Sequence, residues 1–418
     1  MADEEELPDW HEEATELVQK IIKSDDQKVV DEQMKLTELA PLRPAESLEA
    51  FLAILQPQQD ISSTAQTRLR RVHTAVVDAA AEQIFLPSKF SFSEQQVPLD
   101  DVLEHLEKQT GNRLMDYRGH IGQERTPRTL SLSINDRDFW PAADEILDQA
   151  ALKPYEFSGD EGLGLVELEP GSTTRKSRGS YAGPFRIEAT ELTTRRSMVT
   201  PSENRLNVTI NVAWEPRLQP ISMTQKVADV SASDDRDEPV PIKYPDAEFD
   251  IDLQQNSYAT EILLPFELPN RKSSRLKSLT GKLTVLAPAR QVEFRFGKIK
   301  ESLGTEKEAD GVFVKLTRFV PLEGLCEIHM RIRVKGKAAE LDSHGDWVFD
   351  NLAVLENADG KTLDNAGYET TMRSNEEIGF AYLYELEGDI ADYTWVYKTP
   401  AAIRAKTIEY ELRNLPLP

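Results

Sequence analysis

Apolar residues recur at helical spacing through the first part of the chain. Three such stripes predict helices: Trp10–Ile22, Leu48–Leu55 and Leu69–Ile84. A weaker segment at about 26–40 predicts a fourth helix. Prolines, which end or begin helices, separate the stripes at Pro41, Pro44 and Pro57. We therefore expect a helical segment over residues 1–87, either a short HEAT-like stack of two helix pairs or a small bundle that caps the next domain.

The next stretch consists of two copies of one pattern, residues 90–117 and 130–157, offset by 40. In each copy an alternating strand precedes a helical stripe and a second short strand. The stripes are Leu99, Val102, Leu103 and Leu106 in the first copy, and Phe139, Ala142, Ala143 and Ile146 in the second. Few positions are identical: Ser91/Ser131, Ser93/Ser133 and Gln109/Gln149. One copy buries too little apolar surface alone, so we expect residues 88–170 to form one duplicated βαβ domain with both helices on one face of a shared sheet.

The apolar period changes to two after a polar, locally basic linker at 171–180. Alternation over Leu206–Trp214 and over Cys326–Val334 predicts half-buried strands. Many short strands without a helical period are typical of β-sandwiches, which we expect at 181–305 and 306–418. The predicted fold class is thus multidomain α+β, with an N-terminal helical segment, a tandem βαβ module and two C-terminal antiparallel β-sandwiches.

The charge composition limits the classes of binding partner that we expect. The 418 residues hold 49 Lys and Arg against 73 Asp and Glu, a net charge of −24. This field repels nucleic acids and anionic membranes, so we expect binding to neither in general. No run approaches the roughly 18 apolar residues of a membrane span, so no membrane insertion is expected. The acidic start, MADEEELPDW, is no signal peptide, which leaves the cytoplasm, or the periplasm and cell envelope if an export signal precedes this sequence.

Alternating carboxylates offer the one candidate metal site. Asp246, Glu248, Asp250 and Asp252 would share one face of a strand. A hard cation such as calcium would relieve their repulsion. The spacing is not that of a calcium loop, however, and charged residues also protect edge strands from pairing. Calcium is the only cofactor that the sequence suggests, and a solvated edge strand is the other interpretation.

Cysteine, histidine and glycine positions predict structural roles. The single cysteine, Cys326, excludes an intramolecular disulfide, and its strand spacing from His329 places the two on opposite faces, so we expect it in the core. The segment Asp342–Asp346, with His344, reads as an exposed turn. No helix follows the glycine-rich turn 159–164, so it is no phosphate-binding loop. No catalytic residues are predicted, although two carboxylates of a glycosidase could meet from anywhere in the chain.

Two resemblances refine this organisation. The first copy, with Val97-Pro98-Leu99-Asp100-Asp101-Val102-Leu103 and then Gln109-Thr110-Gly111, resembles the short N-terminal domain of secretins and TonB-dependent transducers. The second copy departs from this pattern at its turn, Gln149-Ala150-Ala151. Three further segments resemble an uncharacterised bacterial multidomain family with the same domain order: Tyr181–Arg186, Trp214–Leu218 and Arg413–Pro418. These resemblances imply an architecture and no catalytic residues.

The functional expectation follows from the architecture. A module that docks, together with open strand edges, favours a non-catalytic binding or scaffold protein of the bacterial cell envelope with a protein partner. The alternative is a carbohydrate-active enzyme or a carbohydrate-binding protein. Exposed aromatic residues in one concave groove would favour the alternative, whereas an apolar patch at a sheet edge would favour a protein partner.

Overall fold

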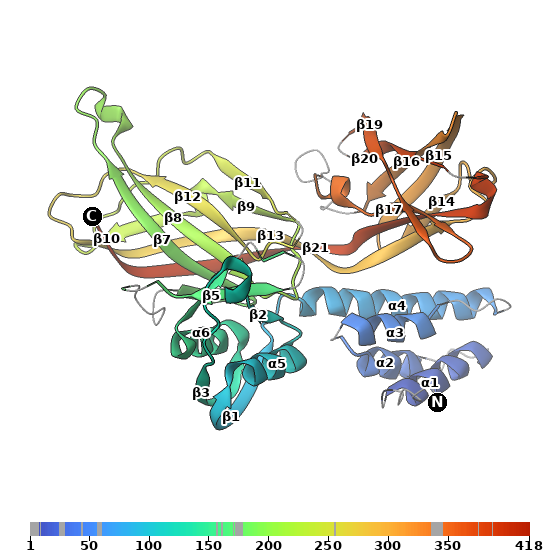
Figure 1. Ribbon diagram of the computed structural model, residues 1–418, viewed down its shortest axis with the longest axis horizontal. Helices are drawn as coiled ribbons and strands as arrows, with labels where there is room; N and C mark the ends of the chain where they lie inside the picture. Colours follow the sequence, from blue (N-terminus) through green and yellow to red (C-terminus); the bar gives the residue numbers. More distant parts are fainter. Residues whose placement is uncertain are drawn as a thin grey trace. The chain divides into compact units, whose positions relative to one another are not determined.

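A computed structural model (Figure 1) describes most of the chain. The described residues are 8, 10–24, 30–42, 45–56, 61–155, 158–159, 162–169, 171, 179–254, 256–335, 346–374, 376–386 and 388–418. Helices and antiparallel strands in several sheets confirm the mixed α+β class. Most of the predicted linker, residues 172–178, lies outside the described residues, and Gly179 already begins a strand.

Two compact units are each assembled from separate stretches of chain. Unit 1 comprises Met1–Ile84, Pro288–Ala339 and Asn351–Arg404, and unit 2 comprises Phe85–Ala287, Glu340–Asp350 and Ala405–Pro418. Two long strands, β13 (Arg275–Phe296) and β21 (Tyr393–Pro416), contribute residues to both units. The units therefore do not follow the order in which the domains were expected along the sequence.

The helical part of unit 1 has the four expected helices: α1 (Trp10–Lys23), α2 (Val30–Leu39), α3 (Ala45–Ile54) and α4 (Ser63–Gln83). The side chain of Ser62 caps α4 by accepting a hydrogen bond from the Ala65 N–H (3.2 Å). The apolar stripes meet in one core with Ala402 of β21: Ala14, Leu17, Val18, Ile21, Leu36, Leu48, Phe51, Leu52, Leu55, Leu69, Val72, Val76, Val77 and Ala80. The helical spacing of apolar residues thus predicted the side chains that pack the helices together and against β21.

An ion cluster makes a second attachment of the helices in unit 1. Arg290 of β13 bonds Glu49 of α3 (Nε to Oε1, 2.7 Å) and Asp310 (Nη1 to Oδ2, 2.7 Å). His73 of α4 lies 3.6 Å from Asp310, between Nδ1 and Oδ1. Burial, which opposes protonation, lowers the pKa of His73 despite the nearby carboxylate.

The strands of unit 1 belong to two sheets. One has the order β14-β15-β16-β20-β19: β14 (Glu306–Ala309), β15 (Val312–Leu322), β16 (Leu325–Val334), β20 (Glu377–Tyr384) and β19 (Gly367–Arg373). In the other, β17 (Ala353–Asn357) lies between β21 and β18 (Thr362–Asp364). Buried aromatic rings join the sheets, since the Trp395 Nε1–H donates to the Tyr384 hydroxyl (2.8 Å) and Tyr382 packs on Trp395.

Unit 2 begins with the duplicated pattern. The first copy is β1 (Lys89–Pro98), α5 (Leu99–Thr110) and β2 (Leu114–Asp116), and the second is β3 (Thr129–Asp138), α6 (Phe139–Ala150) and β4 (Leu152–Tyr155), followed by β5 (Leu163–Glu167). The strand–helix–strand prediction is confirmed, and all eight stripe residues are buried. The shared sheet is wrong: β1 and β3 pair antiparallel in one sheet, while β2 and β4 flank β5 in another.

The residues that are identical in the two copies make equivalent hydrogen bonds. Ser91 Oγ accepts from the Asp136 N–H (2.8 Å) and Ser131 Oγ accepts from the Gln96 N–H (3.2 Å), while Ser93 faces Ser133 in the register. The Leu99 N–H donates to the Arg128 carbonyl and the Phe139 N–H donates to the Ser88 carbonyl, both at 2.9 Å. The residue directly before each copy therefore accepts the first helical N–H of the other copy.

The rest of unit 2 is antiparallel sheet. One sheet has the order β12-β8-β7-β6: β12 (Ala259–Phe266), β8 (Arg205–Trp214), β7 (Phe185–Arg195) and β6 (Gly179–Ala182). The other contains β11 (Glu248–Asp252), β9 (Ser222–Lys226), β13 and β21, with β10 (Ser231–Asp234) paired to β13. Ala213 and Tyr258 of the first sheet join the apolar core of the duplicated module, which places the module against this sheet.

Candidate docking site

The outer edge of β12 is an open side of its sheet. The Trp214 N–H bonds the Tyr258 carbonyl (3.1 Å), so the alternation of an antiparallel ladder turns the backbone groups of Ala259, Glu261 and Leu263 away from β8. No backbone partner for these outward groups is found among the described residues. Leu263, with 52% of its surface exposed, also points to solvent.

The far end of β12 is closed. The Lys243 N–H donates to the Pro265 carbonyl (2.8 Å), and the Glu267 N–H donates to the Pro241 carbonyl (2.8 Å). Proline has no N–H to offer a further strand. The open edge is therefore a short segment, residues 259–263, long enough to pair with an extended peptide over a few residues.

The outer edges of β1, β3 and β11 in unit 2 are protected. The Gln109 side chain accepts from the Ser91 N–H (3.1 Å) and donates to the Ser91 carbonyl (3.0 Å), and Gln149 accepts from the Ser131 N–H (3.4 Å). These amides satisfy backbone groups that would otherwise be open to another strand. Exposed carboxylates line the edge strand β11. Compared with these edges, residues 259–263 are distinctive.

A buried carboxylate fixes the duplicated module to the same sheet. Glu215, which is 0% exposed at the end of β8, accepts hydrogen bonds from the Ser88 N–H (2.9 Å), the Ser88 hydroxyl (2.7 Å), the Asn112 amide (3.1 Å) and Arg217 Nε (2.6 Å). Asn112 in turn accepts from the Arg217 N–H (3.0 Å). Sequence reasoning missed this cluster, although an acid directly after an all-apolar strand end, Val212–Trp214, was a signal for it.

A second buried cluster joins α6 to β6 and β7. Asp144 of α6 accepts from the Tyr181 hydroxyl (2.7 Å) and from Arg186 Nε (2.9 Å). Arg186 also lies 2.8 Å from Glu188, and these two carboxylates outweigh burial and raise its pKa. The Trp140 Nε1–H donates to the Pro184 carbonyl (3.0 Å). The charged groups at this boundary are thus used to position the module.

A third cluster, of ionic side chains, lies in the segment that connects the two copies. Arg118, 1% exposed, donates two hydrogen bonds to Asp116 (2.9 and 2.8 Å) and one to Glu167 of β5 (2.8 Å). Burial opposes ionisation of Asp116, but the hydrogen bonds from Arg118 outweigh it and lower its pKa. The geometry is that of a structural ion pair, in which the charges satisfy one another.

Three of the four calcium candidates lie on one exposed face of a strand at the edge of a sheet, and the fourth, Asp246, lies in a turn. Glu248, Asp250 and Asp252 alternate on β11, as predicted, and Asp246 precedes the strand. Asp250 accepts a hydrogen bond from the Thr224 hydroxyl on β9 (2.9 Å). Within the described ranges, no group of three or more His, Cys, Asp or Glu side chains is placed to hold a metal ion. Calcium binding at these residues stays a prediction.

The other singled-out positions have structural roles or lie outside the described residues. Cys326 is buried on the apolar face of β16, and burial raises the pKa of its thiol to about 11. His329 lies on the other face, where its Nε2 contacts Glu327 (3.1 Å). Residues 336–345, with Asp342 and His344, lie outside the described residues, as does the side chain of Asp346. In the glycine-rich turn, a Cβ on Gly162 would lie 2.8 Å from the Arg113 carbonyl oxygen, so close backbone approach explains that glycine.

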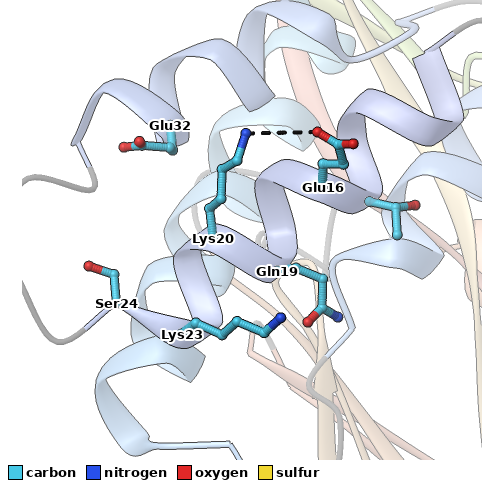
Figure 2. Close-up of a pocket in the computed structure, with 7 residues that line it drawn as sticks. Glu16, Gln19, Lys20, Lys23, Ser24 and Glu32 are labelled. Atoms are coloured by element: carbon cyan, nitrogen blue, oxygen red, sulfur yellow. Dashed lines mark ion pairs between the residues drawn. The ribbon is translucent and has the colours of Figure 1, made fainter.

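A hollow of about 600 Å³, lined by polar and charged residues, lies on the helices of unit 1 (Figure 2). Its lining comes from α1, the residue after it, and α2: Thr15, Glu16, Gln19, Lys20, Lys23, Ser24 and Glu32. Lys20 pairs with Glu16 at 3.8 Å, and both side chains are more than half exposed (60% and 66%). Its charges are therefore well hydrated. None of the described helices combines the length and apolar composition that crossing a bilayer requires.

Comparison with known proteins adds no relative. No family model matches the chain, and no curated protein matches it significantly. The resemblance of residues 90–117 to the secretin and TonB module therefore stands on the residues quoted for it.

Proposed function

We propose that the chain is a non-catalytic binding or scaffold protein of the bacterial cell envelope that docks a protein partner along β12. The proposal includes the finer architecture: a module like that of secretins and TonB-dependent transducers, and two β-sandwiches. The observation that carries it is the open backbone edge at residues 259–263 beside an exposed leucine. An added strand would gain affinity from main-chain hydrogen bonds and specificity from alternate side chains.

The supporting argument is the contrast between edges. The equivalent glutamines protect the strands of the module, carboxylates protect β11, and Pro265 ends the open part of β12. Open edges expose a protein to unwanted pairing. An edge that stays open beside protected ones is explained by a partner that covers it.

Buried ion clusters give this edge a firm support. β12 pairs along β8, and the strand end of β8 carries Glu215, which is bonded to the module. A preformed edge loses little conformational freedom when a partner binds, and this favours affinity. The same rigidity suits a scaffold that holds a partner in one orientation.

Glu261→Pro in the full chain tests the proposal. It removes one outward N–H without a ladder bond to β8, whereas Glu261→Thr removes the same carboxylate and keeps the N–H. The immobilised wild type, Glu261→Pro and Glu261→Thr are each exposed to a bacterial envelope extract, and bound proteins are quantified. We expect a partner that wild type and Glu261→Thr retain and Glu261→Pro loses.

Two results would contradict the proposal. Equal retention of every bound protein by the three chains would remove β12 as the docking edge. Turnover in a screen of glycans and esters, abolished by changing one carboxylate pair while the fold is intact, would favour the carbohydrate-active enzyme instead.

A further inference from the structure

The loop that joins β7 to β8 presents the two most exposed large apolar side chains of the described residues. Met198 is 94% exposed and Val199 is 91% exposed. In the view of Figure 1 the green hairpin that carries them reaches past the neighbouring strands of its unit. Two adjacent aliphatic side chains exposed to water forgo the favourable free energy of burying their apolar surface.

Hydrogen bonds build this loop and hold it. The Ser197 N–H donates to the Asn204 side-chain oxygen (2.7 Å), and the Thr200 N–H donates to the Ser197 hydroxyl (2.9 Å). A turn of 3₁₀-helix follows at Pro201–Glu203, and Lys243 Nζ donates to the Ser202 carbonyl (2.9 Å). The backbone is thus satisfied by polar groups of the loop and its neighbour. The two aliphatic side chains are left projecting from an ordered support.

Basic residues outnumber acidic ones where this loop meets its two strands. Residues 193–205, the loop with the adjoining strand ends, hold three arginines, Arg195, Arg196 and Arg205, and one acid, Glu203, so 3 − 1 leaves a charge of +2 in a chain whose net charge is −24. Arg195 pairs with Glu203 at 3.1 Å, and Arg196 is exposed beside the aliphatic pair. This end of the hairpin is therefore opposite in sign to the molecule as a whole.

We propose that this tip binds the surface of an anionic phospholipid bilayer, with Met198 and Val199 inserted among the headgroups and the arginines at the lipid phosphates. Aliphatic side chains flanked by cations fit that interface, where both apolar burial and attraction to anionic lipid contribute. The remaining acidic surface is repelled, so the molecule approaches with the tip first. The general repulsion expected from composition does not hold at this loop.

The size of the tip favours lipid over a protein partner. A standard protein interface buries about 800 Å² on each side and engages roughly 20–30 residues. The loop at 196–204 has nine residues, whereas insertion into lipid has no minimum area, because each side chain partitions by itself. One such anchor binds weakly and reversibly. This inference is independent of the β12 edge.

Vesicle binding by the full chain tests it. Sedimentation with phosphatidylcholine vesicles is compared with and without phosphatidylglycerol, at low and high salt. We expect binding only with the anionic lipid, weakened by salt. Met198→Asp should reduce the partition coefficient at least tenfold, and Arg196→Glu should reduce both binding and its salt dependence. Leu322→Asp is the matched control, because Leu322 is an exposed aliphatic residue (46%) in another hairpin, beside the acidic Glu323, and should bind like wild type.

A probe reports the insertion itself. Because Cys326 is buried, Val199→Cys gives one accessible thiol for an environment-sensitive dye, whose emission should shift to the blue on anionic vesicles. Absence of binding, or equal binding by wild type and Met198→Asp, would overturn the proposal. Loss of an envelope protein from Met198→Asp, with no vesicle binding by wild type, would assign the tip to a protein and also overturn it.

Discussion

Glu215→Ala should loosen the duplicated module more than any surface change. The variant removes the shared acceptor of Ser88, Asn112 and Arg217 in a site with no exposure. Removing one partner of a buried ion pair costs about 3–5 kcal/mol, and here the buried donors of Ser88 and Asn112 also lose their acceptor. Glu107→Ala is the control. Glu107 lies in α5, 3.9 Å from Arg113, with both side chains about half exposed (48% and 54%), and such a pair contributes below about 1 kcal/mol.

Hydrogen exchange of α5 measures this difference where it arises. Asn112 follows α5 by two residues, so we expect opening of the end of the helix to break its bond to Glu215. At about 1.4 kcal/mol for each factor of ten, amides of α5 should exchange at least roughly 100-fold faster in Glu215→Ala. Glu107→Ala should differ from wild type by less than about fivefold. Equal exchange in the two variants would refute the idea that Glu215 holds the module.

Further predictions concern the module and the single cysteine. Gln109→Ala should cost about 1 kcal/mol, because the Ser91 backbone loses two hydrogen bonds to a side chain and regains water; urea unfolding checks it. Ile146→Ala, at a fully buried position, should cost 2–5 kcal/mol in the same assay, and a loss below about 1 kcal/mol would contradict its place in the core. The Cys326 thiol, with a pKa of about 11, should react with a disulfide reagent at pH 8 only after unfolding. The pKa of Asp116 is lower in the folded state than its unfolded value near 3.9, so the stability it contributes is present above about pH 4 and lost as pH falls through the folded pKa; Asp116→Asn should flatten the acid side of the stability curve.

The periodicity of apolar residues predicted the helices and strands whose buried face is set by nearby positions in the sequence. The i, i+3, i+4 stripe from Leu99 to Leu106 lies in the module core, and the alternation from Cys326 to Val334 separates buried from solvent-facing residues on β16. The helix ends at Gly111, whose left-handed backbone (φ +70°) is one that glycine favours. Local patterns suffice in these cases because each element presents one face to the core.

Contacts between distant residues could not be predicted in this way. The bond from Ser88 to Glu215 spans 127 positions, and nothing in either local pattern names the other. The predicted sheet shared by both copies was wrong for the same reason. It would require β1 and β2 to lie side by side, whereas β1 pairs with β3. The alternation of apolar residues also does not predict a strand as long as β13, because Gly281 and Pro288 interrupt that alternation inside the strand.

The two copies of the module exchange the hydrogen bonds that begin their helices, so each copy depends on the other for its fold. The Leu99 N–H depends on the Arg128 carbonyl, and the Phe139 N–H depends on the Ser88 carbonyl. A solitary copy would lack both that acceptor and its antiparallel neighbour, and two identical solitary copies would supply them to each other across a two-fold axis. The module therefore resembles a homodimer whose two subunits are joined in one polypeptide. β5, which runs parallel to β2 and antiparallel to β4, breaks its symmetry.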